Sequence, residues 1–89
     1  MSGDNGEESV RNAIKGYINQ EVLSGQEIPP VKDDTELVES GILDSLSILR
    51  LVLFIEEKYS LKIAPEDVVR ENFETVEAIS AYVRKRKNL

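Results

Sequence analysis

Apolar residues recur at helical spacing in three separate segments of this 89-residue chain. No stretch of useful length alternates between apolar and polar residues, as a half-buried strand would. The first stripe comprises Val10, Ala13, Ile14, Tyr17 and Ile18, and the last comprises Val76, Ile79, Ser80 and Val83. The pattern predicts an all-α fold, a four-helix bundle of three long helices and one short helix.

Capping residues predict where the first two helices begin and end. Ser9 is the expected N-cap of the first helix, which should end near Ser24 and Gly25. Asp44 should cap a second helix that runs to about Tyr59. Residues 26–43 are then a long loop between helices 1 and 2. Its expected apolar anchors are Ile28, Val31, Leu37, Val38, Ile42 and Leu43.

The remaining boundaries follow from proline and threonine. Pro65 should open the short helix, which would run to about Arg70, because proline is favoured at the first helical position. Thr75 should cap the last helix. Residues 1–8 are small, polar and acidic, so we expect a disordered acidic tail followed by one domain over residues 9–87.

The helix expected over residues 44–59 carries more apolar surface than a core stripe needs. At about 100° per residue, one sector of this helix holds Ile48, Leu51, Val52, Ile55 and Tyr59. Leu46, Leu49 and Leu53 fall in a second sector, roughly 130° away. This second stripe either packs beneath the long loop, against Leu37 and Ile42, or is exposed and binds a partner protein. The sequence leaves both interpretations open.

Composition excludes several classes of function. The chain has no cysteine and no histidine, which removes disulfides, thiolate metal sites and Ser-His-Asp or Cys-His catalysis. The net charge is −6, so a nucleic-acid partner is not expected. The acids Asp33, Asp34, Glu36 and Glu39 do not match a calcium-binding loop, and we expect no metal site.

The chain shows no run of about 18 apolar residues and no secretory signal, so we expect no membrane span and a cytoplasmic location. A monomer is expected. The basic run from Arg84 to Lys87 has two open interpretations. One is a favourable interaction with the C-terminal end of the last helix. The other is a docking or anionic-surface role.

Ser45 lies in the first turn of the second helix, beside the second apolar stripe. The N–H groups and the dipole at a helix N-terminus favour an anion, so a phosphate ester on this hydroxyl would be stabilised. No histidine is available to activate the hydroxyl, and Asp44 is a weak base at neutral pH. Ser45 is therefore better suited to accept a modification than to catalyse a reaction. The competing interpretation is that Asp44 and Ser45 only begin a helix.

Three segments, in order and spacing, resemble the acyl and peptidyl carrier proteins. The first is Asp-Thr-Glu-Leu at residues 34–37. The second is Ser-Gly-Ile-Leu-Asp-Ser-Leu at residues 40–46, followed by a long apolar helix that ends in Glu-Glu-Lys-Tyr. The third, at residues 72–79, is similar to the phenylalanine-containing turn before the last helix of that family. The resemblance extends from about Val10 to Val83.

This resemblance implies that Ser45 is the attachment site for 4'-phosphopantetheine, transferred from coenzyme A by a separate phosphopantetheinyl transferase. Asp44 matches the acid that helps the transferase bind metal and substrate. The partner-facing positions of the family match Leu46, Leu49, Leu53 and Ile42.

The prosthetic arm would supply the thiol that the chain lacks. Acyl, aminoacyl or peptidyl intermediates would ride on it as thioesters. A loading ligase or acyltransferase would attach them, and downstream biosynthetic enzymes would act on them. The chain itself would be a non-catalytic, free-standing carrier.

The chain departs from this pattern at Ser47 and Arg50, where many fatty-acid-synthase carriers place acids. A less acidic helix weakens docking on a basic partner, which favours specialised polyketide or nonribosomal peptide pathways over fatty-acid synthesis. The cargo, acyl or aminoacyl, stays open. Two other functions compete with the carrier. One is a helical adaptor that docks through Leu46, Leu49 and Leu53, and the other is a carboxylate-only hydrolase.

Overall fold

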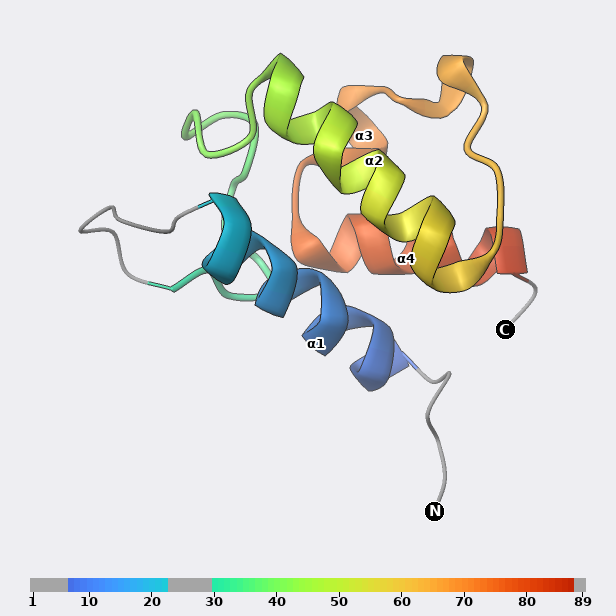
Figure 1. Ribbon diagram of the computed structural model, residues 1–89. Helices are drawn as coiled ribbons and strands as arrows, with labels where there is room; N and C mark the ends of the chain where they lie inside the picture. Colours follow the sequence, from blue (N-terminus) through green and yellow to red (C-terminus); the bar gives the residue numbers. More distant parts are fainter. Residues whose placement is uncertain (1–6, 23–29, 88–89) are drawn as a thin grey trace.

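The computed structural model describes residues 7–22 and 30–87 (Figure 1). The helices in these residues are α1 (Glu7–Tyr17), α2 (Ser45–Tyr59), α3 (Arg70–Phe73) and α4 (Val76–Lys87). A π-helical turn, Ile18–Val22, extends α1, and a 3₁₀ turn, Pro65–Asp67, precedes α3. No strand occurs in the described residues, so the predicted all-α class is confirmed. None of their helices is long and apolar enough to cross a membrane.

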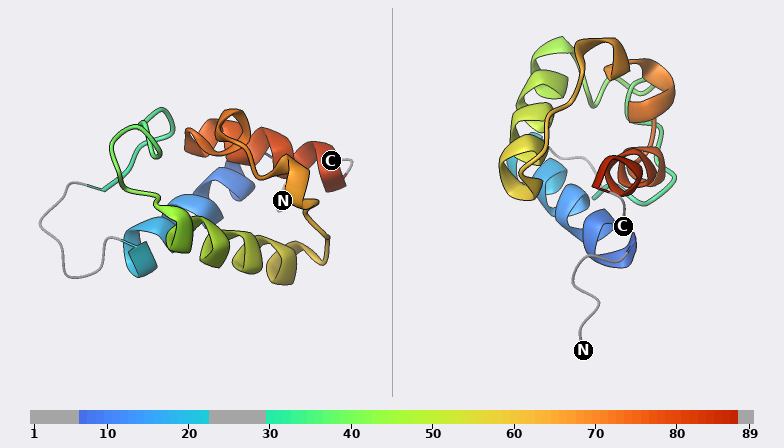
Figure 2. Two further views of the ribbon diagram at one scale, coloured as in Figure 1. Left: turned by 90° about the horizontal axis from the view of Figure 1, so that it is seen from above. Right: turned by 90° about the vertical axis from the view of Figure 1, so that its right-hand side faces the viewer.

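The three long helices enclose a single core. Viewed along the bundle, α1, α2 and α4 surround it, and the segment from the 3₁₀ turn to α3 lies over the remaining side (Figure 2). α1 packs along α4, and α3 packs against the start of α4. Both terminal stripes predicted from the sequence face this core. The fully buried side chains include Val10, Ile14, Ile18, Leu51, Ile55, Phe73, Val76, Ile79 and Val83.

The start of α1 differs from the prediction. The helix begins at Glu7, so Ser9 is a residue of the helix and not its N-cap. Glutamate is a good helix former, and acids are favoured in a first turn because they oppose the positive end of the helix dipole. Of the expected tail at residues 1–8, Glu7 and Glu8 are therefore helical and residues 1–6 lie outside the described part. The predicted end near Ser24 and Gly25 also lies outside it.

The short helix also lies later in the chain than predicted. Pro65 opens only a 3₁₀ turn, and α3 occupies Arg70–Phe73. The carbonyl of Asp67 accepts the N–H of Val69 (2.9 Å) and the side-chain amide of Asn72 (2.8 Å). These bonds occupy the acceptor that a continuing helix would use, so the chain leaves helical geometry after Asp67.

The 3₁₀ turn is held to α4 by Tyr82. The Tyr82 hydroxyl donates to the Asp67 carboxylate at 2.9 Å. Burial, with the Asp67 hydrogen bond as the second cause, raises the pKa of Tyr82 to about 12. In the basic run at the end of α4, the Arg86 guanidinium donates to the Lys62 carbonyl (2.6 Å) and so ties α4 to the chain after α2.

The predicted cap of α4 is confirmed, and it gives a stability prediction. The Ala78 N–H donates to the Thr75 hydroxyl at 3.0 Å. We expect Thr75→Ala to lower the free energy of unfolding by about 0.5–2 kcal/mol, because this N–H loses its acceptor. Thr75→Ser keeps the hydroxyl and should lose much less. Urea unfolding of the three proteins checks this, and equal losses in both variants would contradict the capping role.

The loop between α1 and α2 is anchored to the core and to the turn before α4. Val31, Leu37 and Leu43 are buried, as predicted, and Val38 and Ile42 are half-buried. The anchor expected at Ile28 lies outside the described residues. The Leu37 N–H donates to the Glu74 carbonyl (2.8 Å), and the Glu77 N–H donates to the Asp33 carbonyl (3.1 Å). The loop therefore pairs with the α3–α4 turn.

Candidate functional site

The last loop residues fix the position at which α2 begins. The Leu43 N–H donates to the Leu37 carbonyl at 2.9 Å, and both side chains are buried. Between them Gly41 adopts φ +86°, a left-handed conformation that favours glycine. With Leu43 directed into the core, the chain emerges at the surface at Asp44, which is exposed.

Asp44 then caps α2, as predicted. Its side chain accepts the Ser47 N–H at 2.9 Å, and its carbonyl accepts the Ile48 N–H, also at 2.9 Å. Ser45 follows as the first residue of the 15-residue helix and is exposed. An incoming reagent therefore has access to this residue, and the positive end of the helix dipole favours an anion on it. These features suit a phosphate ester on Ser45.

The second apolar stripe of α2 is exposed. Leu46, Leu49 and Leu53 are 58%, 58% and 65% exposed, and Ile42 beside them is half-buried. The alternative, in which the loop covers the leucines, is wrong, because Leu37 packs into the main core. Exposed leucines in a row cost solvation free energy in the isolated protein, and such a surface is typical of a protein-binding site.

The cap makes the stability of the protein depend on pH. The hydrogen bonds from Ser47 hold the pKa of Asp44 below its usual 3.8, and Arg50 adds to this through its charge. A lowered pKa means that the cap stabilises the fold fully above about pH 3.8 and loses this contribution as pH falls through the lowered value.

We expect acid to destabilise the wild type more than Asp44→Asn, since asparagine caps without titrating. Thermal unfolding midpoints of the two proteins, followed from neutral pH to below pH 3.8, measure the difference. Carboxylates elsewhere titrate in both proteins and cancel in the comparison. A gap between the midpoints that stays constant with pH would contradict this account.

Two acids of the loop, Asp33 and Glu39, act as ion-pair partners. Asp33 contacts Arg11 (3.2 Å) and Lys15 (2.8 Å) of α1, and Glu39 pairs with Arg70 at the start of α3. Within the described residues, no group of three or more acidic side chains has the arrangement of a metal site.

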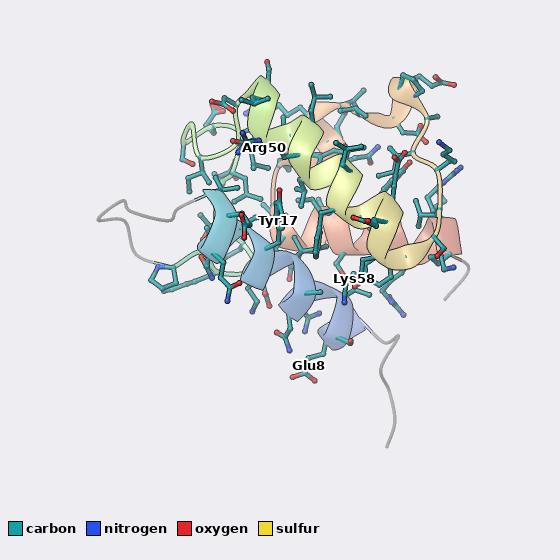
Figure 3. All side chains as sticks on the ribbon, viewed as in Figure 1. Glu8, Tyr17, Arg50 and Lys58 are labelled. Carbon is teal, nitrogen blue, oxygen red and sulfur yellow. The ribbon has the colours of Figure 1, made fainter. Side chains whose placement is uncertain are left out.

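Sequence patterns missed one feature near the site, a stack of Tyr17 from α1 on Phe54 from α2. Their ring centroids are 4.5 Å apart and their planes are inclined by 22°. Figure 3 shows Tyr17 between the two helices. Phe54 is an aromatic residue outside both apolar stripes of α2, and this position indicates that it has a packing partner elsewhere. That the partner is Tyr17 depends on how α1 packs on α2.

Comparison with known proteins identifies the family to which this site belongs. The sequence matches the family model for the phosphopantetheine attachment site over residues 12–83, which includes α2 and the whole candidate site. It is 33% identical to the D-alanyl carrier protein of Lactococcus lactis subsp. lactis over 55 residues, which cover 62% of this chain and 70% of the relative. It is 41% identical to the lincomycin biosynthesis protein LmbN of Streptomyces lincolnensis over 64 residues, or 65% of this chain and 23% of that protein.

Among solved structures, a similar chain occurs in the crystal structure of an FAD-dependent dehydrogenase. The TM-score is 0.72 and the identity 34%, over 79% of this chain and 97% of that chain. The family match spans most of the sequence, and both relatives and the structural match exceed 30% identity. The protein therefore belongs to the phosphopantetheine-binding carrier proteins, which carry 4'-phosphopantetheine covalently on a serine and act as carriers of intermediates.

Proposed function

We propose that Ser45 is the serine that carries the 4'-phosphopantetheine. The observation that supports this is the exposed position of Ser45 at the start of α2, within the segment that matches the family. Asp44, the residue before Ser45, caps the helix by accepting the Ser47 N–H and so holds the backbone around Ser45. When bound, the group supplies a terminal thiol on which cargo is held as a thioester.

In this function the chain's own residues bind and position, and we propose that they catalyse nothing. Ser45 anchors the arm, while Leu46, Leu49, Leu53 and Ile42 form the surface on which a phosphopantetheinyl transferase, a loading enzyme and downstream enzymes dock in turn. The exposure of the three leucines supports this. We further propose that the protein works as a monomer in the cytoplasm, with a carrier domain that runs from the start of α1 to the end of α4 at Lys87.

We propose an acyl or aminoacyl cargo in a specialised pathway. The similarity to a D-alanyl carrier supports an aminoacyl cargo, the similarity to acyl carrier proteins supports an acyl cargo, and a relative from lincomycin biosynthesis supports a specialised pathway. The structural match lies in a structure of an FAD-dependent dehydrogenase, so oxidation of the tethered cargo by a flavoenzyme is a downstream reaction worth testing. Arg50 is exposed on α2 and would repel a basic partner surface of the kind that fits an acidic carrier. This repulsion weakens docking on such a partner.

Incubation of the purified protein with coenzyme A and a broad-specificity phosphopantetheinyl transferase tests the function. We expect the intact mass to rise by one phosphopantetheinyl group. A folded protein that gains no mass, with a known carrier modified in parallel as the control, would overturn the proposal.

A further inference from the structure

The docking face of α2 is almost uncharged, although the whole chain carries −6. From Ser45 to Ile55 the only charged residue is Arg50, and it is exposed. The acids of this helix, Glu56 and Glu57, come near its C-terminal end. An enzyme that covers the first three turns of α2 therefore meets leucine side chains and one cation.

Arg50 has no ion pair among residues 7–22 and 30–87, and its charge acts on Asp44 only through space. Three other basic side chains of these residues are paired. Arg11 and Lys15 share Asp33, and Arg70 pairs with Glu39. When a partner covers a guanidinium that lacks an acceptor, the lost hydration is not replaced, which weakens binding. A partner that seals this face must therefore bring an acceptor for Arg50, and a carboxylate is the strongest one.

Beside Arg50 the surface is hollowed between α2 and α1. The hollow has a volume of about 310 Å³, and its lining residues are Tyr17, Arg50, Leu53, Phe54 and Glu57. Its floor is apolar, because it includes the half-buried Tyr17–Phe54 stack. Figure 3 shows Arg50 and Tyr17 on neighbouring helices on this side of the molecule.

A second hollow of about 450 Å³ continues from the aromatic stack along α1, past Gly16. Gly16 lines this second hollow, and a methyl group there would meet no atom within 4 Å. The two hollows share Tyr17 and Phe54, so the hollowed surface beside Arg50 extends from α2 onto α1.

We propose that the hollow beside Arg50 is a specificity site for the carrier's partner enzymes. The partner inserts an apolar side chain against the Tyr17–Phe54 stack and places a carboxylate on Arg50. Glu57, which also lines the hollow, repels that carboxylate and so favours its placement on Arg50. This inference rests on the proposed carrier function, and it assigns the chemistry of the partner surface: apolar and acidic, not basic.

Two synthetic amphipathic helical peptides test the proposal on the holo-protein, prepared with the transferase and confirmed by mass. The two peptides differ at one position, which lies one helical turn from a central Leu. One peptide has Glu at this position and the other has Lys. In NMR titrations we expect the Glu peptide to bind about tenfold more tightly, as charge complementarity requires. The shift changes should centre on Tyr17, Arg50 and Phe54.

Arg50→Glu should reverse the order of the two peptides. Lys87→Glu makes the same change in net charge at an exposed position on α4 and should leave the order unchanged. Equal affinities on the wild type, an order that Arg50→Glu does not alter, or no binding of either peptide would overturn the proposal. Since the mass gain is recorded before the titration, such a failure is distinct from failure of the carrier function.

Discussion

Replacing Ile55 with alanine is expected to lower the free energy of unfolding by about 2–5 kcal/mol, whereas Leu49→Ala should lower it by about 0.5 kcal/mol or less. Both substitutions truncate a four-carbon side chain on the same helix, so they form a matched pair. Ile55 is 0% exposed and its loss leaves a cavity in the core. Leu49 is 58% exposed, and water already reaches much of it.

Urea unfolding of the two variants and the wild type measures the difference. Leu49→Ala should also slow modification by the transferase, since it removes part of the proposed docking surface without unfolding the domain. If the two variants lost equal stability, α2 would not have separate core and partner faces.

The second large effect is all-or-none. Ser45→Ala should abolish the mass gain with coenzyme A and transferase, because alanine has no hydroxyl to receive the phosphopantetheinyl group. Ser47→Ala, two residues further along the same helix, should be modified as the wild type is. The Asp44 carboxylate accepts its hydrogen bond from the backbone N–H of Ser47, so this bond is retained in the alanine variant.

Circular dichroism on both serine variants checks that α2 is intact. A folded Ser45→Ala protein that still gains mass would place the attachment elsewhere. If Ser47→Ala also lost the modification, the transferase would depend on both serine side chains at the start of α2 and not on the Ser45 hydroxyl alone.

The start of α2 was predictable because its signals are local. Asp44 is a strong N-cap, and the apolar spacing after it is that of a helix. The short helix was misplaced because Pro65 predicts only where a turn opens. What ends that turn is a set of bonds to the Asp67 carbonyl, including one from the Asn72 side chain. Nothing in the spacing of residues 65–72 indicates that arrangement.

The second stripe of α2 stayed undecided for a different physical reason. Its exposure depends on where a long loop packs, and the loop's bonds to Glu74 and Glu77 hold it against the α3–α4 turn. The leucines are left uncovered as a result. The hollow beside Arg50 likewise requires the packing of α1 on α2, which positions Tyr17 against Phe54. These contacts join segments that are distant in the sequence. The spacing of apolar residues within one segment predicts its helix, but not which other segment packs against it.

The state of Ser45 in the native host tests the central claim most directly. The protein should be isolated under mild conditions, digested, and its peptides fragmented in the mass spectrometer before and after treatment with hydroxylamine, which cleaves thioesters. We expect a phosphopantetheinyl group on Ser45, with a further mass that hydroxylamine releases. A peptide with an unmodified Ser45 in every preparation, or an added mass that resists hydroxylamine, would contradict a carrier that holds its cargo as a thioester.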